Sequence, residues 1–304
     1  MQKKIIITTF LIAFFAMHGY AEWIKITSDV PSKSAVVVSG TPDNTVMEIA
    51  LSGFEKHRVK SLVGEYYTIS SPEMTPRMEE GTPDLPKFAL SLIIPDNENM
   101  SLSIEPVEEL TFQNIQIAPS KGNLYRDIKP SDVPYRFGDI YSQDVFFPSN
   151  KGFLRSPFIL RDFRGQTVVI NPFSYNAVTQ TLKVISKIKV TMQQKSGESL
   201  NLLNRTSSLQ KVDRDFANIY QNIFRNAGSY INYLPLSEDG EMLIISDASF
   251  MQAMQPFIDW KIKKGLPVAM VDVATAGGTA QQIKTFIQNY YSTHNLKYVL
   301  LIGD

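Results

Sequence analysis

The C-terminal part of the chain alternates between short apolar runs and amphipathic segments. Continuous apolar runs at 242–245, 268–271 and 298–302 predict buried strands. Between them, residues 249–264 and a segment opened by Thr279 carry apolar residues at helical spacing. This β-α-β-α-β order predicts a parallel sheet with right-handed crossovers.

Single residues indicate where these helices begin and end. Gly265 follows the first predicted helix, at a position where a left-handed glycine commonly ends a helix. Pro256 either kinks that helix or lies in its first turn. Thr279 and Gln282 have the spacing of a capping box, which predicts the start of the second helix.

Residues 22 to about 195 show instead the two-residue period of half-buried β-strands. From Leu182 to Met192, apolar side chains fall on one face and lysines mainly on the other. Many short strands separated by Pro, Gly and Asn turns predict a β-sandwich. Further strand candidates are Phe88–Ile94, Ser101–Ile104, Phe112–Ile117 and Thr167–Ile170.

Two segments follow neither pattern. Lys121 to Asn150 carries three prolines among charged and aromatic residues, which predicts a long ordered loop leaving the sandwich. Residues 193–210 are polar and predict a linker, followed by a short helix that Asp213 would cap. After that helix, the segment that begins at Arg225 looks like a flexible, cleavable junction.

The first residues are typical of a secretory signal peptide. Lys3 and Lys4 precede an apolar run from Ile5 to Met17, and small residues at 19 and 21 predict cleavage after Ala21. The run is shorter than the roughly 20 residues that a transmembrane helix needs, which argues against a membrane anchor. We therefore expect an exported chain with no membrane span after signal removal.

The amino-acid composition limits the functions and the catalytic groups that this segment can have. The net charge is +0, so nothing indicates a nucleic-acid partner, and 43% hydrophobic residues can build a full core. There are no cysteines, which excludes disulfides and a Cys nucleophile within this segment. Of the three histidines, His18 lies in the signal peptide, and His57 and His294 stand in polar contexts where we expect solvated surface residues.

The last residues are Gly303 and Asp304, directly after a predicted buried strand. Ligands and catalytic groups gather past the carboxyl ends of such strands. A carboxylate here either caps a following helix or ligates a hard cation such as calcium. A sheet this small cannot cover its own faces, so we expect the N-terminal part of a longer precursor.

Several strings resemble one family, the gingipains. The segments 242–245, 256–266 and 296–304 are similar to the opening of the gingipain catalytic domain. The segments 118–122, 133–135, 146–148, 157–166 and 175–176 are similar to the gingipain propeptide.

The resemblance implies the precursor of a secreted cysteine endopeptidase that acts on proteins and peptides. It implies a signal peptide at 1–21, a β-sandwich propeptide at 22–225 that is both chaperone and inhibitor, and an incomplete caspase-like α/β domain at 226–304. The propeptide would bind its own catalytic domain. The catalytic His and Cys would lie downstream, Asp304 would be a structural calcium ligand, and no organic cofactor is implied.

Propeptides of this family inhibit by presenting a basic residue to the specificity pocket. Within the matching segment Lys121 and Arg126 are candidates, and Arg126 suits an arginine-preferring pocket because guanidinium pairs bidentately with a carboxylate. Arginine-specific members have an Arg directly before the mature sequence, whereas this chain has Ser229 in the aligned region. The nearest basic residue is Arg225, which predicts cleavage there or a different maturation.

Two alternatives stay open. One is a secreted adhesion or carbohydrate-binding β-sandwich fused to an inactive α/β remnant. The other is a caspase-like member that processes other secreted proteins, like the sortase of a secretion system.

Overall fold

The computed structural model describes residues 21–60, 62–205, 212, 214–230 and 240–303. The chain divides into two compact units. The first, called the sandwich unit below, contains the described residues up to 205 together with Ile223–Ala227. The second, called the α/β unit, contains those from 207 to 222 and from 228 onward.

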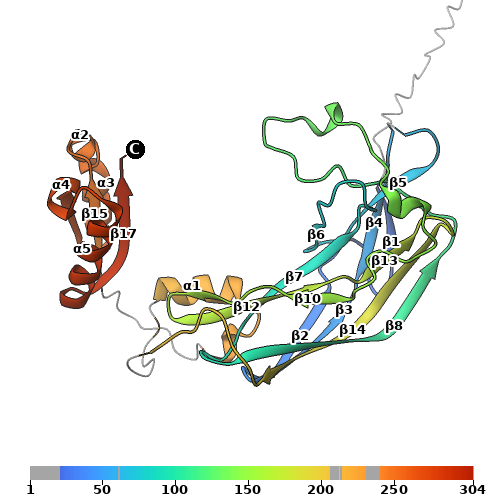
Figure 1. Cartoon of the computed structure of the whole chain (residues 1–304), viewed down its shortest axis with the longest axis horizontal. Coiled ribbons are helices and arrows are strands. Elements are labelled where there is room, and N and C mark those ends of the chain that lie inside the picture. The colour runs from blue at the N-terminus through green and yellow to red at the C-terminus, as the bar shows by residue number, and fades with distance from the viewer. Residues whose placement is uncertain (1–20, 61, 206–211, 213, 231–239, 304) are drawn as a thin grey trace, which may run out of the picture. The chain divides into compact units, whose positions relative to one another are not determined.

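The described strands of the sandwich unit form three sheets (Figure 1). The first has the order β1-β4-β5-β9, from Ala21–Lys25, Gly53–Arg58, Tyr66–Ser70 and Gln116–Ile117. The second has the order β10-β12-β7-β6, from Gly152–Leu154, Phe163–Ile170, Pro86–Ile93 and Thr75–Pro76, with β11 (Phe158–Leu160) also on β12. The third has the order β13-β14-β3-β2, from Phe173–Asn176, Thr181–Lys195, Asn44–Ala50 and Ala35–Thr41, with β8 (Asn99–Phe112) also on β14.

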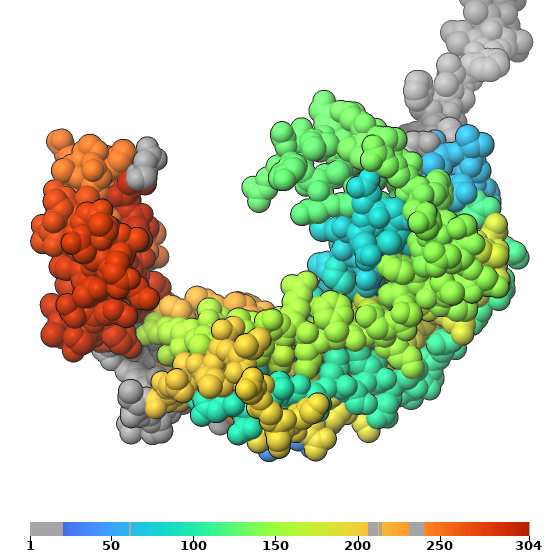
Figure 2. Space-filling model, in the orientation of Figure 1, coloured from blue at the N-terminus to red at the C-terminus, as the bar shows by residue number. Residues whose placement is uncertain are grey.

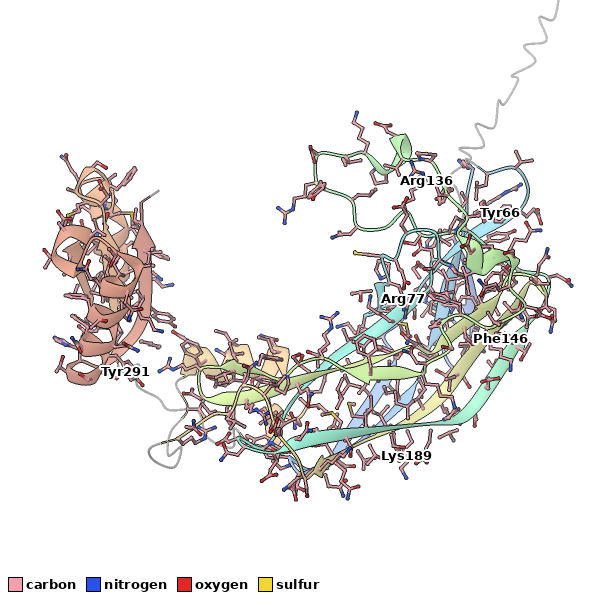
Figure 3. All side chains as sticks on the ribbon, in the orientation of Figure 1. Tyr66, Arg77, Arg136, Phe146, Lys189 and Tyr291 are labelled. Carbon is pink, nitrogen blue, oxygen red and sulfur yellow. The ribbon has the colours of Figure 1, made fainter. Side chains whose placement is uncertain are left out.

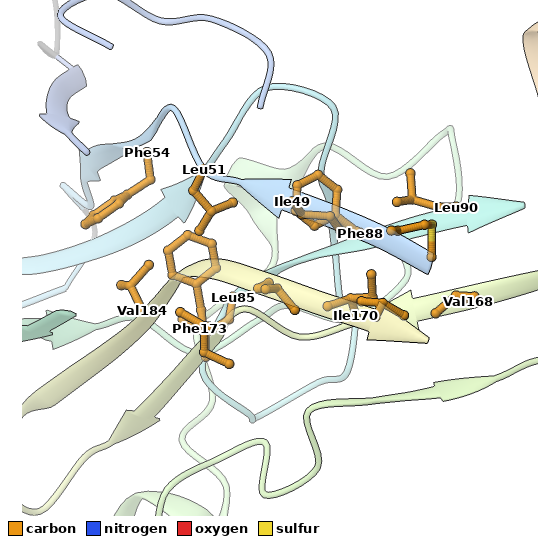
Figure 4. Packing of buried hydrophobic residues seen from close by; sticks show 14 of the residues in the cluster. Ile49, Leu51, Phe54, Leu85, Phe88, Leu90, Val168, Ile170, Phe173 and Val184 are labelled. Carbon is orange, nitrogen blue, oxygen red and sulfur yellow. The ribbon is translucent and has the colours of Figure 1, made fainter. Parts of the chain in front are cut away.

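The main core lies between sheets, where apolar residues of β3, β13 and β14 meet those of β7 and β12 (Figure 4). Ile49, Phe88, Ile170 and Phe173 are each at most 2% exposed. Two facing layers of antiparallel strands with this core confirm the predicted β-sandwich.

The strand predicted at Leu182 to Met192 is confirmed and is longer than predicted, because β14 covers Thr181–Lys195. Its predicted apolar face is buried, with Leu182 and Val190 both 0% exposed. The predicted strand at 167–170 is the end of β12, and the one at 88–94 is β7 shifted by one or two residues.

Two other strand predictions are wrong in their bounds. Residues 101–104 belong to the long strand β8, which pairs with β14 along its length and passes through Pro106. Residues 112–117 do not form one strand, because Phe112 ends β8 and Gln116 begins β9, with Asn114 between them at φ 59. Cross-strand pairing with β14 thus overrides the weak local alternation.

The predicted ordered loop at 121–150 contains no strand and has two short 3-10 helices, η1 at Pro130–Asp132 and η2 at Asp139–Ser142. It protrudes as a green lobe from the sandwich unit (Figure 2). Its return arm is held close to the sandwich, because Gly138 N donates to Gly81 O at 2.9 Å. A Cβ added at Gly138 would lie 2.9 Å from that oxygen, so the close approach requires glycine.

A buried arginine attaches the polar linker to the sandwich. Arg164 on β12 is 0% exposed and donates to four backbone carbonyls, two of them in the linker and two in the loop after β7. It also donates to the Ser199 hydroxyl at 2.6 Å. This part of the predicted linker, residues 199–201, is therefore packed on the sandwich.

The α/β unit has a parallel sheet with β15 (Glu241–Ser246) between β16 (Val268–Asp272) and β17 (Leu296–Ile302), which confirms the predicted topology. Its other elements are α1 (Arg214–Ile223), η3 (Ala227–Ser229), α2 (Ala248–Met251), α3 (Gln255–Lys263), α4 (Val273–Ala276) and α5 (Ala280–Thr293). One face of the sheet packs on Ile258 of α3, and the other packs on α4 and α5. Ile223, the last residue of α1, and Ala227 of η3 group with the sandwich unit.

The predicted helix at 249–264 is divided into α2 and α3, and Pro256 lies in the first turn of α3. Gly265 ends it at φ 88, as predicted. The capping box of Thr279 and Gln282 is confirmed at the start of α5. The predicted cap Asp213 of α1 lies outside the described residues. No helix in the described part of the chain is long and apolar enough to cross a membrane.

Candidate functional site: an exposed loop arginine and the carboxyl edge of the sheet

Arg126 lies at the apex of a tight turn in the protruding loop. Ile128 N donates to Tyr125 O at 3.1 Å, which places Arg126 and Asp127 at the two central positions. Arg126 is exposed, and the adjacent Tyr125 is 80% exposed. Within the described residues, Arg126 forms no hydrogen bond or ion pair. The turn therefore presents an unpaired guanidinium to solvent.

Lys121, the second basic candidate, is engaged within the same loop. Its Nζ donates to Pro130 O at 2.6 Å and lies 4.1 Å from the centroid of the Tyr135 ring. Arg136, also on this loop (Figure 3), contacts Glu80 at 3.4 Å. Of these three basic side chains, Arg126 is thus the one without an internal partner.

The base of the loop is built from aromatic side chains. Phe137 lies edge-on to Tyr66 at 5.4 Å and to Tyr141 at 4.8 Å between ring centroids. The Tyr141 hydroxyl donates to Ile117 O at 2.9 Å, and burial raises the pKa of Tyr141 well above its usual value. These residues line a cavity of about 450 Å³. Their packing makes the foot of the loop a fixed support.

The carboxyl edge of the parallel sheet carries two carboxylates that sequence reasoning missed. Asp247 follows β15 and Asp272 is the last residue of β16. Asp247 accepts bonds from Ser249 N and Oγ, which hold the pKa of Asp247 below its usual value. Asp272 accepts from Ala274 N at 2.9 Å. An acidic residue at the end of each predicted strand was the signal that could have revealed them.

The described residues do not by themselves form a calcium site. Asp304 lies outside them, and no group of three or more His, Cys, Asp or Glu side chains that could hold a metal occurs among them. Asp247 and Asp272 both cap helices. Calcium takes about six to eight oxygen ligands, so Asp304 would need further ligands from elsewhere.

Neither described histidine has a catalytic arrangement. His57 Nε2 lies 2.7 Å from Ser70 Oγ and 3.3 Å from Glu55 Oε2, so one ring nitrogen faces both groups. A catalytic triad needs the two nitrogens to face different partners. His294 stacks on Tyr290 at 3.9 Å at the end of α5.

Arg225, the predicted cleavage residue, lies in a segment bound to the edge of β7. Arg225 N donates to Ser91 O at 2.9 Å, and its guanidinium lies 3.3 Å from Glu73. The neighbouring Phe224 is 2% exposed and Asn226 is 7% exposed. The segment predicted to be flexible is therefore ordered around the predicted scissile bond. Ala21, the predicted signal cleavage residue, is the first residue of β1.

A β-sandwich with a protruding loop precedes the start of a parallel α/β sheet, which fits the class of a propeptide followed by a peptidase domain. Residues 33–227 match the family model Propeptide_C25, and residues 236–304 match Peptidase family C25. The chain belongs to this family, the gingipains.

Sequence relatives from Porphyromonas gingivalis support the assignment to this family. Gingipain R1 is 34% identical over 74% of this chain, and gingipain R2 is 33% identical over 74%. Lys-gingipain is 22% identical over 90% of the chain. The chain spans 23% of gingipain R1, 31% of gingipain R2 and 16% of Lys-gingipain, well under half of each.

Among solved structures, the complex of RgpB pro- and mature domains from the same organism matches with a TM-score of 0.58 and 29% identity. The match covers 64% of this chain and 97% of that chain. A structure on the zymogenic latency of gingipain K matches with a TM-score of 0.50 and 17% identity, which supports the fold.

Proposed function

We propose that this chain is the N-terminal portion of a secreted cysteine endopeptidase zymogen whose propeptide inhibits the enzyme through Arg126. The observation that carries the proposal is the exposed, unpaired guanidinium at the apex of the Tyr125–Ile128 turn. A residue that plugs a specificity pocket must be unengaged within its own domain. Lys121 does not meet this condition, because it is bound within the loop.

The geometry fits a pocket that reads arginine through a carboxylate. Guanidinium and carboxylate form two parallel charge-assisted hydrogen bonds, which gives both affinity and orientation. The aromatic packing at the foot of the loop restricts the motion of the loop before it binds. Less conformational entropy is therefore lost when Arg126 enters a pocket.

In the complete enzyme, a His-activated Cys would attack the peptide carbonyl to form an acyl-enzyme. An oxyanion hole would stabilise the intermediate, the amine would leave with a proton from the His, and water would then release the acyl group. The chain has no cysteine, so we infer that it is inactive by itself. Asp304 would contribute one carboxylate to a structural calcium ion.

Export and maturation belong to the same proposal. The signal peptide would be removed after Ala21 during export toward the cell surface or medium, and the propeptide would be cut after Arg225. The β7-bound conformation around Arg225 means that this segment must open before a protease can cut it.

An inhibition assay tests the proposal. The 304-residue chain, added to an active arginine-specific gingipain, is expected to inhibit it, and Arg126→Ala should weaken inhibition roughly thirtyfold, for a loss of about 2 kcal/mol. Arg136→Ala, an exposed arginine on the same loop, is the matched control and should leave inhibition unchanged. Equal inhibition by the Arg126→Ala chain and the parent would exclude Arg126 as the plug.

A further inference from the structure

A β-bulge at the start of β17 directs two successive side chains toward one carboxylate. Leu296 and Tyr298 lie opposite consecutive residues of β15, and this register shift leaves Lys297 as the extra residue. Neighbouring residues of a regular strand point to opposite faces, whereas a bulge changes the direction of a side chain. Lys297 and Tyr298 both reach Asp215, in the first turn of α1.

The two contacts share one oxygen. The Tyr298 hydroxyl donates to Asp215 Oδ2 at 2.7 Å, and Lys297 Nζ lies 3.1 Å from the same atom. The next residue of α1, Phe216, stacks on the Tyr298 ring at 5.9 Å between centroids. The bulge thus binds the helix through a charge, a hydroxyl and an aromatic ring.

Burial of Lys297 makes this ion pair more important for stability than a surface pair. The Lys297 side chain is 2% exposed, whereas that of Asp215 is 42% exposed. A buried ammonium requires a compensating charge, and removal of one partner from such a pair is far more costly than loss of a surface pair. Departure of α1 would take the Asp215 carboxylate away from Lys297.

The two partners lie on opposite sides of the predicted maturation site in the sequence. Asp215 precedes Arg225 and Lys297 follows it. We propose that the Lys297–Tyr298 bulge is a docking site for Asp215 and Phe216 in the first turn of α1, and that it keeps this prosegment helix on the peptidase unit after the connecting chain is cut. This inference builds on the proposed zymogen function.

The docking site is separate from the catalytic edge. Lys297 and Tyr298 stand near the amino end of β17, whereas ligands and catalytic groups gather past the carboxyl ends of such strands. The contact therefore supplies affinity for the propeptide without occupying the active-site edge, and it acts independently of Arg126.

Amine footprinting of the 304-residue chain tests the docking site without any peptidase activity. Lysines would be acylated with N-hydroxysulfosuccinimide acetate and each site read by mass spectrometry. Asp215→Asn should raise the labelling rate of Lys297 at least roughly tenfold, because the charge of the Asp215 carboxylate no longer holds α1 over the buried amine. The rate at Lys284, exposed on α5, should stay constant. Asp259→Asn, the same substitution on α3, is the matched control.

A substitution of Lys297, the other partner, tests the same contact through the order of α1. Lys297→Met keeps the apolar length of the side chain and should raise hydrogen exchange in residues 216–222 by a similar factor. Lys297 labelling within twofold of the parent in Asp215→Asn, or unchanged exchange of α1 in Lys297→Met, would overturn the docking site. Because neither readout involves catalysis, such a failure would leave the proposed peptidase function standing.

Discussion

The side-chain amide of Asn226 pairs with both backbone groups of Ile93. Asn226 Oδ1 accepts from Ile93 N at 2.8 Å, and Asn226 Nδ2 donates to Ile93 O at 2.9 Å. The amide thereby replaces a neighbouring strand at that point of β7. Together with the bond from Arg225 N to Ser91 O, this holds the Arg225–Asn226 peptide bond against the sheet edge.

We expect Asn226→Ala to accelerate proteolysis after Arg225. The substitution removes two buried hydrogen bonds and leaves both Ile93 groups unpaired, which costs about 1–3 kcal/mol each. Local opening, which a protease needs, should become at least roughly tenfold more frequent. Limited digestion with trypsin, followed by mass spectrometry of the fragments, measures the rate at this bond.

Asn222→Ala is the matched control for this prediction, because its amide donates to Asn218 O on the exposed surface of α1. It should leave the cleavage rate at Arg225 unchanged. If Asn226→Ala is cut no faster than the parent chain, the Asn226 amide does not protect the bond.

Arg164→Met should destabilise the sandwich unit by about 3 kcal/mol or more, because four carbonyl acceptors lose their donor inside the protein. For a unit of this size the melting temperature should fall by about 6–12 °C. Urea unfolding and thermal scans measure both. Arg58→Met replaces an exposed arginine and should change neither, and an equal effect of the two substitutions would contradict the role of Arg164.

Asp84 makes stability depend on pH. Burial raises the pKa of this carboxyl, which accepts no hydrogen bond from the described residues, and Tyr135 and Tyr141 lie nearby. The folded state therefore keeps the proton at pH values where the unfolded chain has lost it. This contribution to stability is present at low pH and is lost as the pH rises toward the folded pKa.

Asp84→Asn removes this titration. Its free energy of unfolding should be close to that of the parent near pH 3 and should exceed it at pH 7, as measured by urea unfolding across that range. Asp127→Asn, in the exposed turn, should show no such divergence. A constant difference between Asp84→Asn and the parent at all pH values would argue against a buried ionised carboxylate.

The elements that sequence predicted well are those in which burial alone fixes the pattern. Leu182–Met192 alternates because one face of β14 is in the core, and β15 is a continuous apolar run because both of its faces are covered. Strand β8 was misread because its outer face carries acidic residues around Pro106. Those residues pair across to β14, with Glu108 2.6 Å from Lys187 and Glu109 3.4 Å from Lys183. Complementary charges on the two segments were the available signal.

The sequence names candidate residues for the inhibitory loop but does not show which of them is unpaired in the fold. The sequence and its family resemblance indicate two basic residues of one loop, Lys121 and Arg126, and favour Arg126. Which of them is unpaired depends on the distant contacts of Lys121 with Pro130 and Tyr135. The bulge at Lys297 was unpredictable for a related reason, because a register shift is set by the pairing strand rather than by local sequence.

Gly165→Ala tests whether the packing of Phe224 protects the bond after Arg225 from cleavage. A Cβ at Gly165 would lie 2.4 Å from the Phe224 ring and 2.9 Å from Phe158, so the ring must move. Phe224 stacks on Phe158 and directly precedes Arg225, so its displacement should loosen the segment and accelerate trypsin cleavage after Arg225 without any change at the scissile bond. Gly228→Ala is the matched control, because its Cβ would meet nothing within 4 Å. Unchanged cleavage in Gly165→Ala, with the melting temperature of the parent, would show that Phe224 packing does not hold the junction closed.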